Sequence, residues 1–532
     1  MNRFLKRASK SMSIGGAATL LISISLLGQV LGFLKVKLIN ANFPATGLQS
    51  TDAYFAAFKI PDFFFMTIAA GALGVAFIPY LSDKLEKGDK KGAWQISSSL
   101  LNLLMIFMFV VGLLIFVFAE QLISTLVGPN LEPEQLSNAV TIMRLVALNP
   151  LMFTISGILM SVQQTIGRFF FYAVAPLFYS IAIIASIFLF RNNVGIVGLG
   201  VGAVAGAVLQ LGVALAGMWG TKFRYETMIR WENAAFRGVL RQLPARSIDQ
   251  GIDAINSIAE TNFANRLGSG NITYYENAYV IHTTPIMLIG TAISTAAYPK
   301  LTERLSMGRP DLFRKDFIDV LRAMIWILMP VIIVSFFARG YLARIIYAKP
   351  DDANQIALIL GFLCGAIFFR TIYQIISRYF YANKDSVTPL LVSVFIIALN
   401  IFLAWKLSNR NSYGVAGLAI AQSIAAAAEV FILVILMLIR DKKIFTLNFL
   451  GDLTRIMSVS GFAVVATYIA ISFLPLNASD IGFITLGTKL VAISLVTFGV
   501  YIFMSSLFNI EESKVVTNRI KKIVFKPVKI DW

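Results

Sequence analysis

Charged side chains interrupt two apolar segments near the start of the chain. Lys35 lies with Gln29 in LLGQVLGFLKVKLINANF, and Asp52, Lys59 and Asp62 lie in TDAYFAAFKIPDFFFMTIAAGALGVAFIPYLSDK. Charge in hydrocarbon is costly, so such residues usually face a wet cavity lined by protein. Ammonium and amide groups together can neutralise and hydrogen-bond the several oxygens of a diphosphate. The pattern predicts a cationic site for an anionic group inside a membrane protein.

Each of these residues also has a structural interpretation. Lys35 and Lys37 can snorkel from a helix end to the interface; we assign Lys37 to snorkelling and leave both roles open for Lys35. Asp52 follows a polar loop and can satisfy free backbone N–H groups at a helix start, which explains it as well as binding does. Lys59 and Asp62 are three residues apart and can pair, although we interpret Lys59 as lining the cavity.

Three further polar residues lie in apolar segments of the second half. Glu276 either caps a helix or is a titratable carboxylate of the cavity. Arg370, in AIFFRTIYQ, pairs with an acid such as Glu260 or Glu276, or it contacts the ligand. His282 is the only histidine, and we interpret it as a hydrogen-bonded structural residue rather than a proton switch.

Composition identifies a polytopic membrane protein. The chain is 57% hydrophobic and 14% charged, with a mean hydropathy of +0.75, against roughly 25% charged residues in soluble domains. With one cysteine and one histidine, no disulfide framework or Cys/His metal site is expected. We find no Walker A loop and no Ser/His/Asp arrangement, so neither a cofactor nor catalysis is expected. We attribute the net charge of +18 to membrane topology rather than to nucleic-acid binding.

Apolar runs of about 20 residues predict an all-α protein with about 14 transmembrane helices. The expected spans are 14–40, 52–80, 97–118, 139–162, 172–190, 196–219, 243–265, 272–298, 318–338, 356–380, 387–406, 414–439, 455–474 and 484–508. About 30 basic residues fall in loops on one side and about 7 on the other. Both termini are therefore expected in the cytoplasm.

Two pairs of segments suggest an internal repeat. GVAFIPYLSDKL (Gly74–Leu85) is similar to STAAYPKLTERL (Ser294–Leu305), and GRFFFYAVAPLFYS (Gly167–Ser180) to SRYFYANKDSVTPLLVS (Ser377–Ser393). The copies lie roughly 210–220 residues apart, which predicts two six-helix lobes in parallel orientation plus two C-terminal helices. We expect lobes at 1–220 and 221–445, a lipid-tail groove at 446–510, and a basic cytoplasmic tail at 511–532.

Several of these segments resemble the MurJ/MviN family of the multidrug/oligosaccharidyl-lipid/polysaccharide exporter superfamily. The resemblance rests on the TDA…AFKIP…AFIPYL pattern, LGFLK, GRF…APLF, YPKL, and SRYFYANKDSVTP, which is similar to RxFYAxxDxxTP. It covers most of the first twelve helices. It implies a flippase that moves lipid II across the bacterial cytoplasmic membrane, with fourteen helices and both ends cytoplasmic.

The chain departs from the family pattern among the charges. Gln29 and Lys35 stand where the family's SRxLGFxRD has its two arginines, and Asp62 and Phe65 stand where an amide and an arginine are expected. By resemblance we carry over only Lys35, Asp52 and Lys59.

The expected function is alternating-access transport of lipid II by a monomer, with no catalysed reaction. Alternatives are a flippase for another polyprenyl-diphosphate oligosaccharide and a drug/cation antiporter. Outside the superfamily, a membrane glycosyltransferase would need a long extramembrane loop with a carboxylate, and a scaffold protein would bind a partner through its basic loops. An antiporter would want a net acidic cavity, whereas here intramembrane Lys and Arg exceed the acids.

Overall fold

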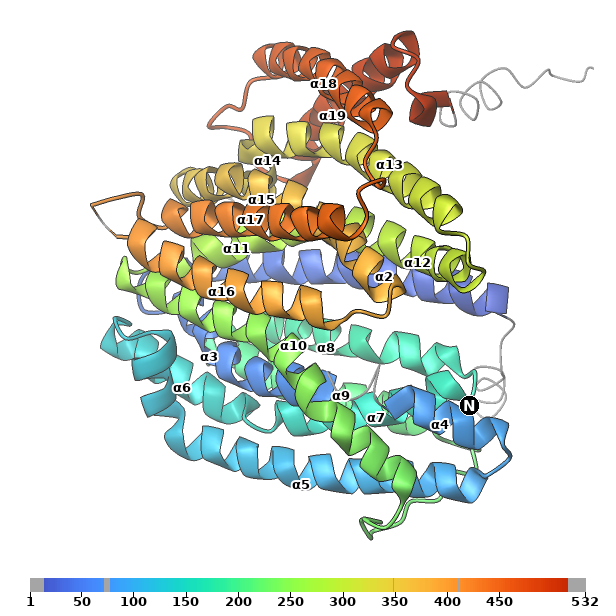
Figure 1. Cartoon of the computed structure of the whole chain (residues 1–532). Helices are drawn as coiled ribbons and strands as arrows, with labels where there is room; N and C mark the ends of the chain where they lie inside the picture. Colours follow the sequence, from blue (N-terminus) through green and yellow to red (C-terminus); the bar gives the residue numbers. More distant parts are fainter. Residues whose placement is uncertain (1–13, 71–76, 348, 410, 515–532) are drawn as a thin grey trace, which may run out of the picture. The chain divides into compact units, whose positions relative to one another are not determined.

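A computed structural model describes residues 14–70, 77–347, 349–409 and 411–514 of the chain. The described residues are 83% helix and contain no strand, so the predicted all-α class is confirmed (Figure 1). They form two compact units, Met1–Thr273 and Tyr274–Trp532. The predicted tail, apart from 511–514, lies outside the described residues, as do the basic residues before the first helix.

The first unit is a bundle of long helices joined by short loops. Its elements are α2 (Ile14–Asn42), α3 (Thr51–Phe64), η1 (Phe65–Ala70), α4 (Ile78–Glu86), α5 (Lys90–Leu122), η3 (Ile123–Val127), α6 (Pro133–Val146), α7 (Asn149–Thr165), α8 (Phe169–Phe190), α9 (Val197–Gly217) and α10 (Ala234–Arg266). α8 packs on α9 and α2, and α10 packs on η1, α3 and η3.

The second unit repeats the part of this plan from α3 to α9 and adds two helices. α11 (Asn271–Pro285) crosses from one unit to the other, followed by η4 (Ile286–Thr291), α12 (Ala292–Ser306), α13 (Pro310–Phe337), α14 (Arg339–Ile346), α15 (Pro350–Ala382), α16 (Val387–Leu407), α17 (Ala416–Arg440), α18 (Leu447–Phe473) and α19 (Phe483–Leu507). α18 and α19 pack on each other and on α13. A buried core that joins α12 to α19 holds this unit together.

Twelve helical stretches of the described residues are long and apolar enough to span a membrane. Each matches one of the fourteen predicted spans. The remaining two predictions are also helical where described: 52–80 is covered by α3, η1 and α4, and 243–265 lies within α10. α10 is far more polar than its neighbours. For this reason, length and composition alone do not identify it as a membrane span.

Helix starts agree with the predicted repeat. α3, α5 and α9 begin at 51, 90 and 197, and α11, α13 and α17 begin at 271, 310 and 416, which is 220, 220 and 219 residues later. Gly88 and Gly308 both have positive φ, at 75° and 68°, which only glycine adopts without strain. The two units therefore share one backbone plan.

The second sequence pairing was misaligned. Gly167 has φ 77° just before α8, and its counterpart before α16 is Lys384, with φ 61°. Ser377, which we matched to Gly167, lies inside α15. The left-handed position is a glycine in the first copy and a lysine in the second. The residue types therefore did not reveal that Gly167 and Lys384 correspond.

Prolines and π turns break several predicted helices. The span expected at 139–162 is two helices, α6 and α7, and Pro150 lies in the first turn of the second. Pro61 lies four residues before η1, and Pro285 lies directly before η4. A proline removes one ladder hydrogen bond and crowds the preceding turn, so the backbone locally rewinds.

Asp385 secures the start of α16. Its carboxylate accepts hydrogen bonds from the backbone N–H groups of Val387 and Thr388, both at 3.0 Å, and pairs with Arg440 at 2.6 Å. Burial alone would raise the pKa of Asp385, but the hydrogen bonds from Thr388 and Arg440 outweigh it and hold the pKa at about 2. Asp385 thus caps the first free N–H groups of α16.

We predict that Asp385→Ala lowers the stability of the protein by at least about 1 kcal/mol, the usual cost of a lost cap. Asp385→Asn should cost less because asparagine keeps the cap. Since the folded pKa lies below the ordinary 3.8, this stabilisation is present above about pH 4 and is lost as the pH falls towards 2. Thermal unfolding in detergent between pH 7 and pH 3 measures both effects. An alanine variant as stable as the parent at pH 7 would contradict the assignment.

Candidate functional site

Lys35 lies on α2 among aromatic side chains of the first unit. The residue is partly buried, and its Nζ lies 5.7 Å from the ring centre of Tyr179 on α8. The Asp62 carboxylate on α3 acts electrostatically on Lys35 and on Tyr179. Tyr179 in turn packs edge-on against Phe153 of α7 at 5.1 Å. This ammonium group is held by a ring face and a neighbouring carboxylate, a setting that leaves donors for an anion.

Lys59 connects α3 with α10. Its Nζ donates a hydrogen bond of 2.7 Å to Ser257 Oγ. Directly before Ser257 on α10, Asn256 donates to the Glu260 carboxylate at 3.0 Å, and Glu260 is only 3% exposed. The polar side of α10, whose role the sequence analysis did not identify, therefore lies against the helix that carries Lys59.

Asp52 has a structural role in the fold, and its role in binding stays a prediction. Ser50, not Asp52, caps α3, because its hydroxyl accepts the Asp52 N–H. The fully buried Asp52 carboxylate instead accepts hydrogen bonds from Gly270 N at 2.6 Å, Thr273 N at 2.8 Å and Thr273 Oγ1 at 2.6 Å. It thus stabilises the start of another helix, α11, where free N–H groups favour an anion.

The other two predicted site residues outside the Arg370 region are Gln29 and Glu276. Gln29 is exposed on α2, and its role in binding stays a prediction. Glu276 is the sixth residue of α11, which has no acidic residue in its first turn, so the capping interpretation was wrong. It is partly buried, and its role as a cavity carboxylate stays untested.

Arg370 pairs with an acid that the sequence analysis overlooked. Its Nη1 lies 3.0 Å from Glu429 Oε2 on α17, and the Glu429 side chain is 1% exposed. Ser393 of α16 donates a second hydrogen bond to Glu429 at 2.7 Å, and the Tyr373 hydroxyl lies 3.3 Å from Ser393 Oγ. The carboxylate thus joins α15, α16 and α17. The fold supports the ion-pair interpretation of Arg370, with Glu429 in place of the expected Glu260 or Glu276.

Some of these partners left a signal in the sequence. Glu429 is the only acid between Gly414 and Arg440, and a lone acid in an apolar span is a strong indication of a partner. Ser257 and Tyr179 left none, because a serine or a tyrosine in a transmembrane helix is ordinary.

The comparisons with known proteins decide the family. The family model described as lipid II flippase MurJ matches residues 46–509. The chain belongs to this MurJ family. It is 24% identical over 433 residues to a probable lipid II flippase MurJ of Borreliella burgdorferi, covering 80% of this chain and 84% of the relative. A probable MurJ of Thermotoga maritima is 24% identical over 482 residues, with 89% and 93% covered.

Solved structures agree on the fold. A MurJ structure in an inward closed conformation superposes with a TM-score of 0.76 at 23% identity, over 92% of this chain and 98% of that chain. An inward-facing multidrug MATE transporter superposes with a TM-score of 0.62 at 15% identity, over 83% and 98%. The chain is thus a multi-pass membrane protein of a transporter family.

We predict that Arg370→Met destabilises the protein by about 3–5 kcal/mol, because it leaves the Glu429 carboxylate buried without its cation. Adding Glu429→Gln should restore much of that loss, since no uncompensated charge then remains. Thermal unfolding in detergent compares the two variants.

Transport by the double variant separates the two interpretations of Arg370. A stable and active double variant means that the pair is structural. A stable but inactive one assigns Arg370 a contact with the transported molecule.

Proposed function

We propose that this protein flips lipid II, a polyprenyl-diphosphate-linked peptidoglycan precursor, from the inner to the outer leaflet of the bacterial cytoplasmic membrane. The observation that carries the proposal is the pair of lysines in the first unit. Lys35 on α2 and Lys59 on α3 are partly buried among aromatic and hydroxyl groups of a transporter-family fold. Two such ammonium groups suit a diphosphate, which hydrocarbon alone would exclude.

The finer features of the proposal follow from the sequence. Loop charges support cytoplasmic termini, and the shared backbone plan of the two units supports two rocking lobes, 1–220 and 221–445. We assign the polyprenyl tail to a groove in 446–510 and membrane-surface contact to 511–532. The protein acts as a monomer, binds no nucleic acid and catalyses no reaction, so transport is driven by membrane potential or an ion gradient.

A second candidate is transport of another polyprenyl-diphosphate oligosaccharide. It is favoured by Gln29 and Asp62, which stand where the family carries an arginine and an amide. A site with fewer positive charges can bind a different sugar head group and still bind the diphosphate. A drug/cation antiporter is disfavoured, because the family model that matches the chain is that of a lipid II flippase.

Depletion of the protein in its own host tests the substrate. Lipid II should accumulate in the inner leaflet while its synthesis continues. Normal delivery of lipid II to the outer leaflet in a host without a second flippase would refute the proposal. Accumulation of a different polyprenyl-linked glycan would support the second candidate.

We predict that Lys35→Ala and Lys59→Ala each abolish complementation of such a host without affecting membrane insertion. A hydrogen bond to a charged group contributes about 1.5–3 kcal/mol, so transport of lipid II into vesicles should fall roughly 10- to 100-fold. Lys35→Arg should retain much of the activity.

Two controls accompany these variants. Lys87→Ala removes an exposed lysine that pairs with Asp83 on the surface, and it should be fully active. Ser257→Ala removes the hydrogen-bond partner of Lys59, and activity in this variant shows that the ammonium group acts directly. Full activity of both Lys35→Ala and Lys59→Ala would remove the site.

A further inference from the structure

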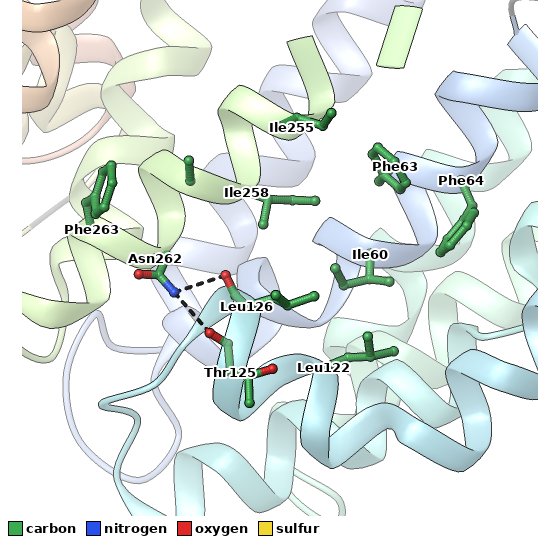
Figure 2. Close-up of a pocket in the computed structure, with 11 residues that line it drawn as sticks. Ile60, Phe63, Phe64, Leu122, Thr125, Leu126, Ile255, Ile258, Asn262 and Phe263 are labelled. Carbon is green, nitrogen blue, oxygen red and sulfur yellow. Dashed lines mark hydrogen bonds between the residues drawn. The ribbon is translucent and has the colours of Figure 1, made fainter. Parts of the chain in front are cut away.

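An apolar crevice of about 440 Å³ opens in the first unit between α3, α10 and the end of α5 with η3. Figure 2 shows its walls: Phe63 and Phe64 come from α3, Ile255 and Ile258 from α10, and Leu122 and Leu126 from α5 and η3. Its volume lies in the range of small-molecule sites, about 300–1,000 Å³. It holds neither Lys35 nor Lys59 and is separate from the site proposed above.

The two polar side chains in the crevice are already engaged. Asn262 donates to the carbonyls of Thr125 and Leu126 at 3.4 and 3.0 Å, as Figure 2 shows, and its Oδ1 accepts from Arg266 at 2.9 Å. The Thr125 hydroxyl donates to the carbonyl of Gln121. A buried water needs two to four polar partners, so this lining favours hydrocarbon over water or a polar head group.

The position of the crevice along α3 suits the hydrocarbon layer of a bilayer. Ile60 and Phe64 are nine and thirteen residues into α3, about 14–20 Å along the axis from its polar start, and the hydrocarbon layer is about 30 Å thick. At the mouth, Leu126 and Ile255 are each 48% exposed. In a membrane protein such exposed apolar side chains contact acyl chains.

We propose that this crevice binds one acyl chain of a membrane phospholipid, inserted between α3 and α10. Lys59 and Ile60 are consecutive on α3, as are Ser257 and Ile258 on α10. The crevice and the Lys59–Ser257 hydrogen bond thus lie between the same two helices, and an acyl chain in the crevice sets the spacing of these helices. Occupancy of the crevice is thus a means by which membrane composition acts on the position of Lys59.

The experiment uses the full chain in nanodiscs that contain a phospholipid with a diazirine near the end of one acyl chain. After irradiation, mass spectrometry should locate labelled residues in 60–64, 122–126 and 255–263. Ala259→Phe, which fills the crevice from α10, should reduce this labelling at least tenfold. Labelling of the exposed α19 residues Ile484 and Leu495 should remain unchanged as an internal control.

Two further variants keep the test decisive. Leu126→Trp narrows the crevice from the opposite wall and replaces Ala259→Phe if that variant misfolds. Lys59→Ala should keep the label whether or not the protein transports lipid II, so failure of the proposed function leaves this result unaffected.

Either of two results would overturn the proposal. The first is crevice labelling no stronger in the parent than in Ala259→Phe and Leu126→Trp. The second is labelling by a diazirine polyprenyl phosphate but not by the phospholipid.

Discussion

The hydrocarbon of a bilayer offers no hydrogen bonds, so every charged group in a spanning helix must find its partner within the protein. Asp52 and Glu429 show how strictly this chain obeys that constraint. Asp52 accepts three hydrogen bonds at the start of α11, and Glu429 takes a cation and a hydroxyl from two other helices. Both carboxylates are almost fully buried. In each case the charge determines which helices meet and at which residue, because a shifted register would leave an anion in an apolar medium.

The repeat duplicates this scaffold but not its charges. With starts 220 residues apart, α11 carries Tyr279 where α3 carries Lys59, and His282 where α3 carries Asp62. The second unit instead has its ion pair between α15 and α17. Two copies of one backbone plan thus hold different chemistry, and both lysines of the proposed site lie in the first unit.

The sequence was sufficient for the class, the helices and the repeat because these depend on long apolar runs and on a fixed offset. It was sufficient for Lys35 and Lys59 as candidates, since charge in an apolar run is conspicuous.

The sequence did not determine which residues these charged groups contact. Asp52 was correctly associated with a helix start, but with the wrong helix, because Gly270 and Thr273 are distant in sequence and the contact depends on packing. Arg370 was assigned the wrong acid for the same reason. Lys384 was missed as the counterpart of Gly167, since the left-handed backbone there is imposed by the turn rather than by the residue type.

The partner that a buried cation already has affects whether that cation can bind a ligand. Arg370 lies 3.0 Å from the Glu429 carboxylate. A ligand that bound Arg370 in place of Glu429 would leave this carboxylate buried without a cation, and the ligand would have to offset that free-energy cost. Lys35 lies beside a ring face and is influenced by the Asp62 carboxylate, and Lys59 donates to the Ser257 hydroxyl. Exchanging a hydroxyl for a phosphate oxygen strengthens the bond to an ammonium group, because the acceptor is then charged. We therefore keep Lys35 and Lys59, rather than Arg370, as the predicted contacts of a diphosphate.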